Sequence, residues 1–406
     1  MRILLLTQWF DPEPTFKGLA FARALAARGH SVEALTGFPN YPGGRVYNGY
    51  KVRVRERETI DGIRITRVPL YPSHDGSSVR RIANYASFAA CATLLGPFSV
   101  SKPDVVYVYH PPGTIGLPAW VIGALRRCPF VYDIQDLWPD SVAASGMMSS
   151  RLLNRVLDRW CRMVYGAAAH IVVLSPGFKR VLAGRGVPED RVSVIYNWCD
   201  ETALQSAREQ RDTGDTPGGD RFRVVFAGTM GKVQALGAVL EAAARIQSLR
   251  RQVDFVFVGS GVGVNSLKES AAALGLHNVT FLPRRPFCEI GGVLRSADAL
   301  LVHLKDDPLF EITIPSKTQA YMSMAKPVVM GVRGDAADLV AAARCGVVCE
   351  PENPESITEA VLRLQSMSPE ARSRMGQNGR RFYDDHLSLQ AGVARFEQVF
   401  QGVTAA

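Results

Sequence analysis

Residues 254–264 read Asp-Phe-Val-Phe-Val-Gly-Ser-Gly-Val-Gly-Val, an apolar run followed by three closely spaced glycines. The run 254–258 predicts a β-strand, and an apolar helical period follows over 264–274. Glycine between a strand and a helix allows a tight turn and close backbone approach to a phosphate-bearing ligand. Val264 stands where a dinucleotide fingerprint requires Gly or Ala, which disfavours an NAD site and favours a turn open to another nucleotide.

The same alternation of apolar strand and helix extends in both directions from this stretch. In the first half, strands are predicted at 2–7, 31–36, 63–68, 104–109, 130–133, 171–174 and 192–195. In the second half, strands are predicted at 222–227, 254–258, 279–282, 299–303, 327–331 and 347–349. Their continuous Val, Ile and Leu content is typical of parallel strands that helices cover on both faces.

This pattern predicts an α/β fold with two doubly wound, Rossmann-like domains. We expect the first domain at 1–200 and the second at 201–383, with a polar, Gly-rich linker at 205–221. The last helix, at about 384–406, is expected to pack back on the first domain. Ligands bind outside the carboxyl ends of such strands, so we expect the active site in a cleft between two facing domains.

Composition narrows the class of protein. The chain has 406 residues, 47% of them hydrophobic and 21% charged, which excludes a disordered or fibrous protein. The seven cysteines are scattered without a CxxC pair, so we expect no disulfide framework or zinc site, and a cytoplasmic location. The formal net charge of +9 suits acidic partners such as nucleotides or anionic lipid, whereas no nucleic-acid-binding signature is present.

One uncharged stretch, IANYASFAACATLLGPFSVS at 82–101, follows Arg80-Arg81. Three interpretations stay open: a helix buried in the core, a helix lying in a membrane interface, and a helix that crosses a bilayer. Polar residues, Gly and Pro dilute the stretch and disfavour a crossing. Together with the two arginines and the basic region 45–67, it predicts peripheral contact with anionic membrane lipid.

Two segments carry the strongest chemical signals. In FEITIPSKTQ at 310–319, a proline near a helix start leaves N–H groups free for an anion, and Lys317 adds positive charge. Glu311, just before this point, suits a ligand that carries a phosphate and neighbouring hydroxyls. His110 ends an apolar strand and therefore lies at the edge where ligands bind. The plain alternatives are a solvated loop glutamate beside a helix cap, and a structural histidine.

A third segment contains acids. Asp133, Asp136 and Asp140 follow a strand, and they suit either a metal or general base, or simple loop caps. Gly231-Lys232 lacks the GxxxxGK[ST] frame, which excludes a P-loop NTPase. The HExxH and GxSxG motifs are also missing.

Together these segments resemble glycosyltransferase family 4, the retaining nucleotide-sugar enzymes of the GT-B fold, which has two facing Rossmann-like domains. The resemblance runs along nearly the whole chain and is most specific at 311–329, with Pro315-Ser316-Lys317 inside it. Residues 36–42 and 136–140 are similar to a narrower subgroup that transfers L-fucosamine-type amino-deoxy sugars in O-antigen and capsule assembly.

The resemblance implies roles for the matching residues. Glu311 matches the first glutamate of an EX7E motif, which contacts the donor sugar; His110 matches a histidine near the reacting carbon; and Lys232 lies where a cation neutralises the leaving diphosphate. These three are the expected catalytic residues. Donor binding is assigned to Lys17, Gly18, Gly228, Thr229, Gln234, Gly259, Gly261, Arg285, Pro315, Ser316, Lys317 and Gln319. Acceptor binding is assigned to Asn40, Tyr41, Asp136 and Asp140, and no metal or other cofactor is expected.

The implied activity moves a sugar such as L-FucNAc from a UDP- or GDP-sugar to a glycan or polyprenyl-diphosphate-linked acceptor at the inner face of the cytoplasmic membrane. The sequence departs from the family at Gln319, where the second glutamate of EX7E is usual, and at Thr229 and Gln234, where Arg and Lys are usual. Two alternatives stay open. One is a nucleotide-sugar epimerase or hydrolase of the same architecture, and the other is a non-catalytic nucleotide-sugar-binding protein.

Overall fold

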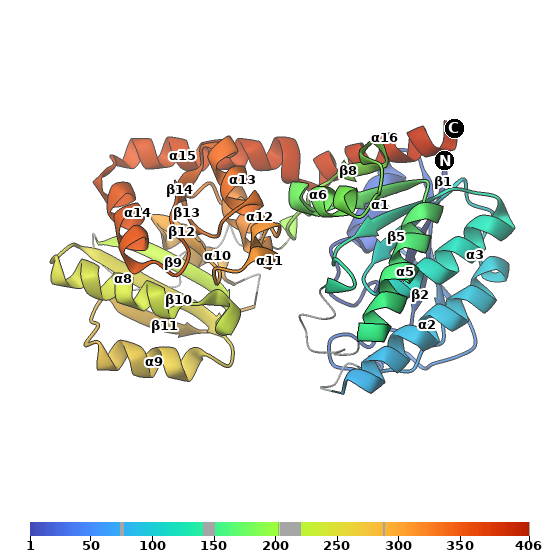
Figure 1. The fold of residues 1–406 in the computed structure, drawn as a ribbon, viewed down its shortest axis with the longest axis horizontal. Coiled ribbons are helices and arrows are strands. Elements are labelled where there is room, and N and C mark those ends of the chain that lie inside the picture. Colours follow the sequence, from blue (N-terminus) through green and yellow to red (C-terminus); the bar gives the residue numbers. More distant parts are fainter. Residues whose placement is uncertain (74–76, 141–150, 202, 204–220, 287–288, 406) are drawn as a thin grey trace. The chain divides into compact units, whose positions relative to one another are not determined.

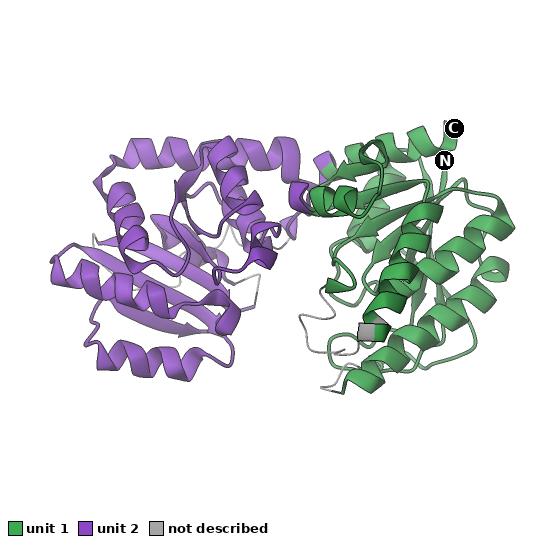
Figure 2. Ribbon diagram, in the orientation of Figure 1, with its two compact units in different colours: residues 1–174, 178–195, 392–406 green, residues 175–177, 196–391 purple. Residues whose placement is uncertain are grey.

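A computed structural model describes residues 1–406 except 74–76, 141–150, 202, 204–220, 287–288 and 406. The chain forms two compact units, coloured separately in Figure 2. Unit 1 comprises residues 1–174, 178–195 and 392–406, and unit 2 comprises residues 175–177 and 196–391. The sequence had placed the domain change after residue 200 and the return of the C-terminal helix near 384. The predicted linker 205–221 lies outside the described residues except for its last position.

Unit 1 carries one sheet in the order β3-β4-β2-β1-β5-β6-β7-β8. Its strands are β1 (Arg2–Thr7), β2 (Ser31–Gly37), β3 (Glu56–Ile60), β4 (Ile63–Val68), β5 (Val105–His110), β6 (Phe130–Ile134), β7 (His170–Val173) and β8 (Val192–Val194). Its helices are α1 (Leu19–Ala27), α2 (Ser78–Ser99), α3 (Gly116–Arg126), α5 (Arg151–Ala167), α6 (Pro176–Gly184) and most of α16 (Leu389–Ala405).

All pairings in this sheet are parallel except the antiparallel pair β3–β4. Every side chain of β5 is buried, as expected for a central strand with helices on both faces. The sequence missed β3 because its residues alternate between half-buried and exposed, as on a sheet edge. Arg67, counted within the predicted basic surface, is in fact fully buried, and its Nε donates to Glu58 at 2.5 Å.

Unit 2 carries a parallel sheet in the order β11-β10-β9-β12-β13-β14. Its strands are β9 (Phe222–Thr229), β10 (Val253–Ser260), β11 (Val279–Pro283), β12 (Ala299–His303), β13 (Val328–Gly331) and β14 (Gly346–Val348). Its helices are α8 (Gly237–Ser248), α9 (Val264–Ala273), α10 (Gly291–Ser296), α11 (Pro308–Glu311), α12 (Ser316–Ser323), α13 (Asp335–Ala343), α14 (Pro354–Ser366) and α15 (Pro369–Phe382). The prediction of two parallel-sheet, Rossmann-like α/β domains is confirmed.

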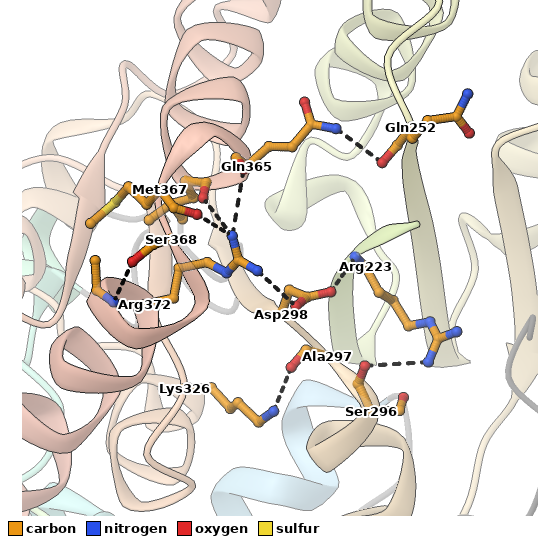
Figure 3. A network of polar contacts seen from close by, with 12 residues as sticks. Arg223, Gln252, Ser296, Ala297, Asp298, Lys326, Gln365, Met367, Ser368 and Arg372 are labelled. Carbon is orange, nitrogen blue, oxygen red and sulfur yellow. Dashed lines mark hydrogen bonds and ion pairs between the residues drawn. The ribbon is translucent and has the colours of Figure 1, made fainter. Parts of the chain in front are cut away.

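A polar network closes the end of unit 2 at which β9 and β12 begin (Figure 3). The backbone N–H of Arg223 donates to the Asp298 carboxylate at 2.9 Å, and Arg372 of α15 lies 3.6 Å from the same carboxylate. Lys326 donates to the carbonyl of Ala297 at 2.6 Å. These contacts tie α15 and the strand beginnings together, whereas ligands of doubly wound sheets bind at the opposite edge, where the strands end.

Helix α2 contains most of the stretch 82–101. One side of the helix is buried, including Phe88 and Ala92, while Leu94 and Phe98 on the other side are 70% and 78% exposed. A wholly buried core helix is therefore wrong for this stretch. Across the described residues, the structure contains no helix with the length and apolar character that crossing a membrane requires.

The C-terminal helix α16 contributes directly to the core of unit 1. Phe396 is fully buried, and its ring lies 5.2 Å from that of Phe21 and 5.3 Å from that of Tyr107. Tyr107 lies on β5, so these aromatic contacts join the end of the chain to the centre of the sheet.

We expect Phe396→Ala to lower the free energy of unfolding of unit 1 by about 3–5 kcal/mol, because it removes a fully packed ring. Urea unfolding followed by tryptophan fluorescence measures this change. Phe98→Ala, at an exposed position of α2, is the control and should cost less than about 0.5 kcal/mol. Equal losses in the two variants would contradict this placement of α16.

Candidate functional site

The candidate ligand-binding edge of unit 2 lies where its strand order reverses, between β9 and β12. From β9 the chain continues to β10 on one side, and β12 pairs on the other side. In doubly wound sheets this reversal opens a crevice at the carboxyl ends of the strands. The ends of β9 and β10 are Gly228-Thr229 and Gly259-Ser260, paired in register. Several predicted donor-binding residues therefore fall at this one edge.

Two glycines make this edge possible. A Cβ on Gly259 would lie 1.9 Å from the carbonyl oxygen of Gly228, and one on Gly261 would lie 2.3 Å from that of Met230. Gly259 has φ 150° and Gly261 has φ 147°, a region that side chains rarely adopt. Any other residue would push the two strand ends apart, so both glycines are explained by this close approach.

Lys317 brings positive charge to the same edge. A Cβ on Gly228 would lie 3.2 Å from its Nζ, which also sits 3.7 Å from the centre of the Phe226 ring. This Nζ is shielded from solvent and has no hydrogen-bond partner among the described residues. Burial lowers the pKa of Lys317 to about 7. A bound anion would stabilise the Lys317 ammonium strongly, because the Phe226 ring is only a weak partner for its charge.

The start of helix α12 adds a second source of positive potential. Pro315 is the N-cap and offers no side-chain hydrogen bond, and Ser316 is exposed. The helix itself supplies no acceptor for the first backbone N–H groups, at Ser316 and Lys317. N–H groups at a helix start and an adjacent ammonium together suit a phosphate. The three residues predicted to bind the donor here, Pro315, Ser316 and Lys317, therefore lie together at the start of α12, where a phosphate would fit their charge.

Two predicted donor-binding amides are instead used within the protein. Gln319 is 3% exposed, and with its amide nitrogen turned inward it donates to the carbonyls of Pro315 at 2.9 Å and Ser316 at 3.1 Å. The Gln234 side chain accepts from the N–H of Gly231 at 2.9 Å. Both side chains shape the loops around the site. Neither points to a ligand in this arrangement, which departs from the sequence prediction.

The remaining predicted residues of unit 2 are mostly accessible. Glu311 ends α11 and is exposed, Lys232 and Thr229 are exposed, and Arg285 is half-buried. The structure shows no direct contact of Glu311 with Lys317. Arg333, which sequence reasoning missed, has its pKa raised mainly by a hydrogen bond to Glu350, with smaller contributions that include Glu311. Glu311 therefore lies close enough to Arg333 for the two charges to interact.

In unit 1 the corresponding reversal of strand order lies between β1 and β5, and His110 ends β5. His110 is 2% exposed, and burial lowers its pKa to about 3, so the imidazole is neutral at physiological pH. Its ring lies 5.8 Å from that of Trp138. Its Nδ1 has no hydrogen-bond partner among the described residues. His110 can therefore act as a neutral hydrogen-bonding group but cannot supply a cation.

The predicted anion site at the start of α1 is taken by the protein's own acids. The carboxylate of Asp11 accepts from the N–H of Leu19 at 2.6 Å, and a Cβ on Gly18 would lie 2.1 Å from it. Lys17 is fully buried, and its Nζ lies 2.5 Å from Asp133. Burial lowers the pKa of Lys17, and Asp133 opposes that shift. The assignment of Lys17 and Gly18 to donor binding is thus not supported by this geometry, because Asp133 pairs with Lys17 and the Asp11 carboxylate lies directly beside Gly18.

The predicted acceptor residues divide into buried and accessible groups. Asn40 is 1% exposed, and its N–H and that of Tyr41 both donate to Glu13 at 2.7 Å. The half-buried Tyr41 ring stacks on Trp9 with centroids 4.7 Å apart. Sequence reasoning missed Glu13, since a glutamate between two prolines carries no recognisable signal. Its role is to hold the loops after β1 and β2 together.

The two acceptor aspartates are both exposed. Asp140 forms an ion pair with Arg185, whereas the structure shows no hydrogen bond for the Asp136 side chain. Within the residues that the structure describes, no three side chains of His, Cys, Asp or Glu come together as a metal-binding group.

Comparison with known protein families assigns both halves of the chain. Residues 19–198 match the family described as "Glycosyl transferase 4-like domain", and residues 208–382 match "Glycosyl transferases group 1". The chain is 25% identical over 331 residues to the putative colanic acid biosynthesis glycosyl transferase WcaI of Escherichia coli K12, covering 78% of this chain and 80% of that protein. It is also 25% identical over 273 residues to the probable glycosyltransferase WbjE of Pseudomonas aeruginosa, covering 64% of this chain and 66% of that one.

Solved structures show the same fold at low identity. HepE of Anabaena in complex with UDP-glucose superposes with a TM-score of 0.68 at 15% identity, over 99% of this chain and 100% of that one. A UDP-forming α,α-trehalose-phosphate synthase from Burkholderia xenovorans gives a TM-score of 0.71 at 11% identity, over 98% and 100% of the two chains. These neighbours are GT-B glycosyltransferases, so the GT-B architecture expected from the sequence is confirmed.

We expect Lys317→Met to stabilise the ligand-free protein at pH 6 by about 1–3 kcal/mol, because it removes a buried ammonium without a hydrogen-bond partner. The pKa of Lys317 in the folded state, about 7, lies below its ordinary value of 10.5. The unfolded chain therefore binds more protons between these pH values, and wild-type stability should rise as the pH increases from 7 to 10.5. The variant should lack this rise.

Urea unfolding at pH 6 and pH 9 measures both effects. Lys326→Met is the matched control, because the Lys326 ammonium has a carbonyl partner at 2.6 Å and its removal should not stabilise. A loss of stability in Lys317→Met at pH 6 would show that the ammonium is well satisfied in the folded protein.

The pair Lys17–Asp133 gives a second prediction. Lys17→Met should lower the free energy of unfolding by about 3–5 kcal/mol, since it leaves the buried Asp133 carboxylate without its cation. Arg2→Ala, which breaks the exposed pair Arg2–Asp104, should cost no more than about 1 kcal/mol in the same urea experiment. If Lys17→Met is no more costly than Arg2→Ala, Lys17 is free for a ligand after all.

Proposed function

Because the chain belongs to the GT-B glycosyltransferases, with a 4-like domain followed by a group 1 domain, we propose that it transfers a sugar from a nucleoside-diphosphate sugar to a glycan or lipid-linked acceptor. The observation that carries this proposal is the Lys317 ammonium, buried without a hydrogen-bond partner beside Gly228 and the start of α12. A diphosphate supplies the two negative charges that this arrangement lacks.

The relatives support a place in cell-surface polysaccharide synthesis. The name of one refers to colanic acid biosynthesis, and a structural neighbour was solved with UDP-glucose. We propose a UDP-sugar donor first and a GDP-sugar second, with an amino-deoxy sugar such as L-FucNAc as the group transferred. A polyprenyl-diphosphate acceptor is confined to a bilayer, so we also propose that the enzyme works peripherally at the inner face of the cytoplasmic membrane.

The proposed chemistry uses fixed positive charge at the leaving group. As the bond from the anomeric carbon to the diphosphate breaks, negative charge grows on the phosphate oxygens. Lys317, the first N–H groups of α12 and the exposed Lys232 would stabilise that charge. We propose that no metal is required for this step, because these groups supply the same kind of stabilisation.

The other proposed roles concern the sugar and the acceptor. Glu311 would accept hydrogen bonds from the sugar hydroxyls, and His110, neutral at working pH, would hydrogen-bond near the reacting carbon. In a retaining transfer the acceptor hydroxyl attacks the face that the diphosphate leaves. Its oxygen bonds to the anomeric carbon, and its proton passes to a diphosphate oxygen, so charge and atoms balance without a second carboxylate.

The test is incubation with a panel of UDP- and GDP-sugars and a polyprenyl-diphosphate sugar acceptor, with the nucleotide product measured by chromatography. We expect transfer that requires acceptor, and a loss well above tenfold in kcat/KM for Glu311→Ala and for His110→Ala, where tenfold equals about 1.4 kcal/mol of transition-state stabilisation. Glu350→Ala is the matched control, because it removes another exposed carboxylate near Arg333.

Other outcomes identify the competing functions. Turnover of donor without acceptor, giving an epimer or free sugar, would establish an epimerase or hydrolase. Donor binding without any turnover across the panel would establish a binding protein. Full activity in both Glu311→Ala and His110→Ala would refute the assigned catalytic residues.

A further inference from the structure

We infer that the outer face of helices α2, α3 and α5 docks on an anionic lipid bilayer. This inference deepens the proposed function and rests on it, because it names the surface through which a lipid-linked acceptor would be reached. The observation behind it is a concentration of exposed apolar side chains. Half of the large apolar side chains exposed among the described residues lie on these three helices. They are Val79, Ile82, Leu94 and Phe98 on α2, Trp120 and Leu125 on α3, and Leu152, Val156 and Met163 on α5.

Helix α2 is apolar on both of its sides. The inner side packs Phe88, Ala92 and Gly96 into unit 1. The outer side exposes a stripe at helical spacing: Val79, Ile82, Ala83, Ala86, Ala90, Leu94 and Phe98. A helix on the surface of a water-soluble domain normally turns polar residues outward. An apolar outer stripe indicates that something other than water covers it.

The three helices form one continuous surface. Helix α3 packs between α2 and α5, and Figure 1 shows the three side by side in unit 1. The right-handed connections from β4 to β5, β5 to β6 and β6 to β7 place them on the same face of the sheet. The exposed side chains of the three helices can therefore meet one flat partner at the same time.

Charge on this face selects an anionic partner. Helices α2 and α3 contain no Asp or Glu, and the single acid of α5, Asp158, is paired with Arg162 at 2.9 Å. The same three helices also carry or adjoin exposed arginines: Arg80 at the start of α2, Arg127 just after α3, and Arg155, Arg159 and Arg162 on α5. Apolar side chains that enter the acyl boundary and arginines that meet the headgroups are the two parts of an interfacial membrane surface.

The partner of this face is therefore an anionic bilayer rather than a protein. A protein partner of stable affinity would need its own acids in matching positions, whereas phosphate headgroups supply negative charge wherever the arginines fall. No helix of the described residues can span a membrane, so binding through this face is binding to the surface.

The experiment is co-sedimentation of the full chain with vesicles of phosphatidylcholine containing about 30% phosphatidylglycerol, a typical anionic fraction. Wild-type protein should bind these vesicles and bind pure phosphatidylcholine at least about tenfold more weakly. The variant Leu94→Ser/Phe98→Ser should lower the partition coefficient by at least about tenfold, because it removes two deeply inserting side chains. Arg155→Ala/Arg159→Ala should lower it by about threefold or more and weaken its dependence on salt.

The matched control is Leu249→Ser/Leu274→Ser, which changes two exposed leucines of unit 2 in the same way. It should leave vesicle binding unchanged. UDP binding in vesicle-free solution is measured for every variant and confirms that each one is folded. Sedimentation velocity on the wild type tests whether the face instead joins two copies of the chain.

Several outcomes would overturn the inference: no binding of wild type to anionic vesicles, equal binding to neutral ones, no effect of Leu94→Ser/Phe98→Ser, or self-association abolished by that variant. The proposed function is judged separately, by transfer to a short-chain acceptor in solution. Transfer without vesicle binding would remove only the membrane inference. Vesicle binding without transfer or UDP binding would remove only the proposed function.

Discussion

The proposed donor site depends on a lysine amino group that unit 2 buries without a hydrogen-bond partner among the described residues. The Nζ of Lys317 is shielded from solvent beside Gly228, and only the Phe226 ring faces it within hydrogen-bonding or stacking distance among the described residues. Burial holds the pKa of this lysine near 7. Such a group lowers stability, and proteins keep it where a ligand supplies the missing charge. The glycines at the ends of β9 and β10 let the backbone pack closely beside this lysine and the start of α12.

In unit 1, by contrast, the charged side chains near the strand ends are paired within the protein. Lys17 pairs with Asp133, Asp11 caps the start of α1, and Glu13 accepts three backbone N–H groups. These contacts hold the loops after β1 and β2 together, and the charges that form them are already paired within the protein. What unit 1 presents instead is a half-buried aromatic pair, Trp9 and Tyr41, and the neutral His110. This difference agrees with a donor site in unit 2 and an acceptor role for unit 1.

Much of the fold was predictable because parallel strands buried on both faces produce continuous apolar runs. The bounds of β1, β4 and β12 match their predictions. The antiparallel edge strand β3 was missed because half-buried strands leave weaker patterns. At the site, spacing placed Lys317 and Glu311 on the correct strand-to-helix connection, but it could not show where side chains turn. Lys17, Gln319 and Gln234 were assigned to the donor, yet each bonds within the chain. The partner of Lys17 is distant in sequence, whereas Gln319 and Gln234 bond to backbone groups three or four residues away, and spacing does not show either choice.

The most direct test of the central claim is proton uptake during UDP binding, measured by titration calorimetry at pH 8 in buffers of different ionisation enthalpy. If the diphosphate pairs with the Lys317 ammonium, the pKa of that lysine rises from about 7, and wild-type protein takes up about one proton for each UDP bound. Lys317→Met should bind UDP more weakly and take up none. Equal affinity and equal proton uptake in the two proteins would contradict the account.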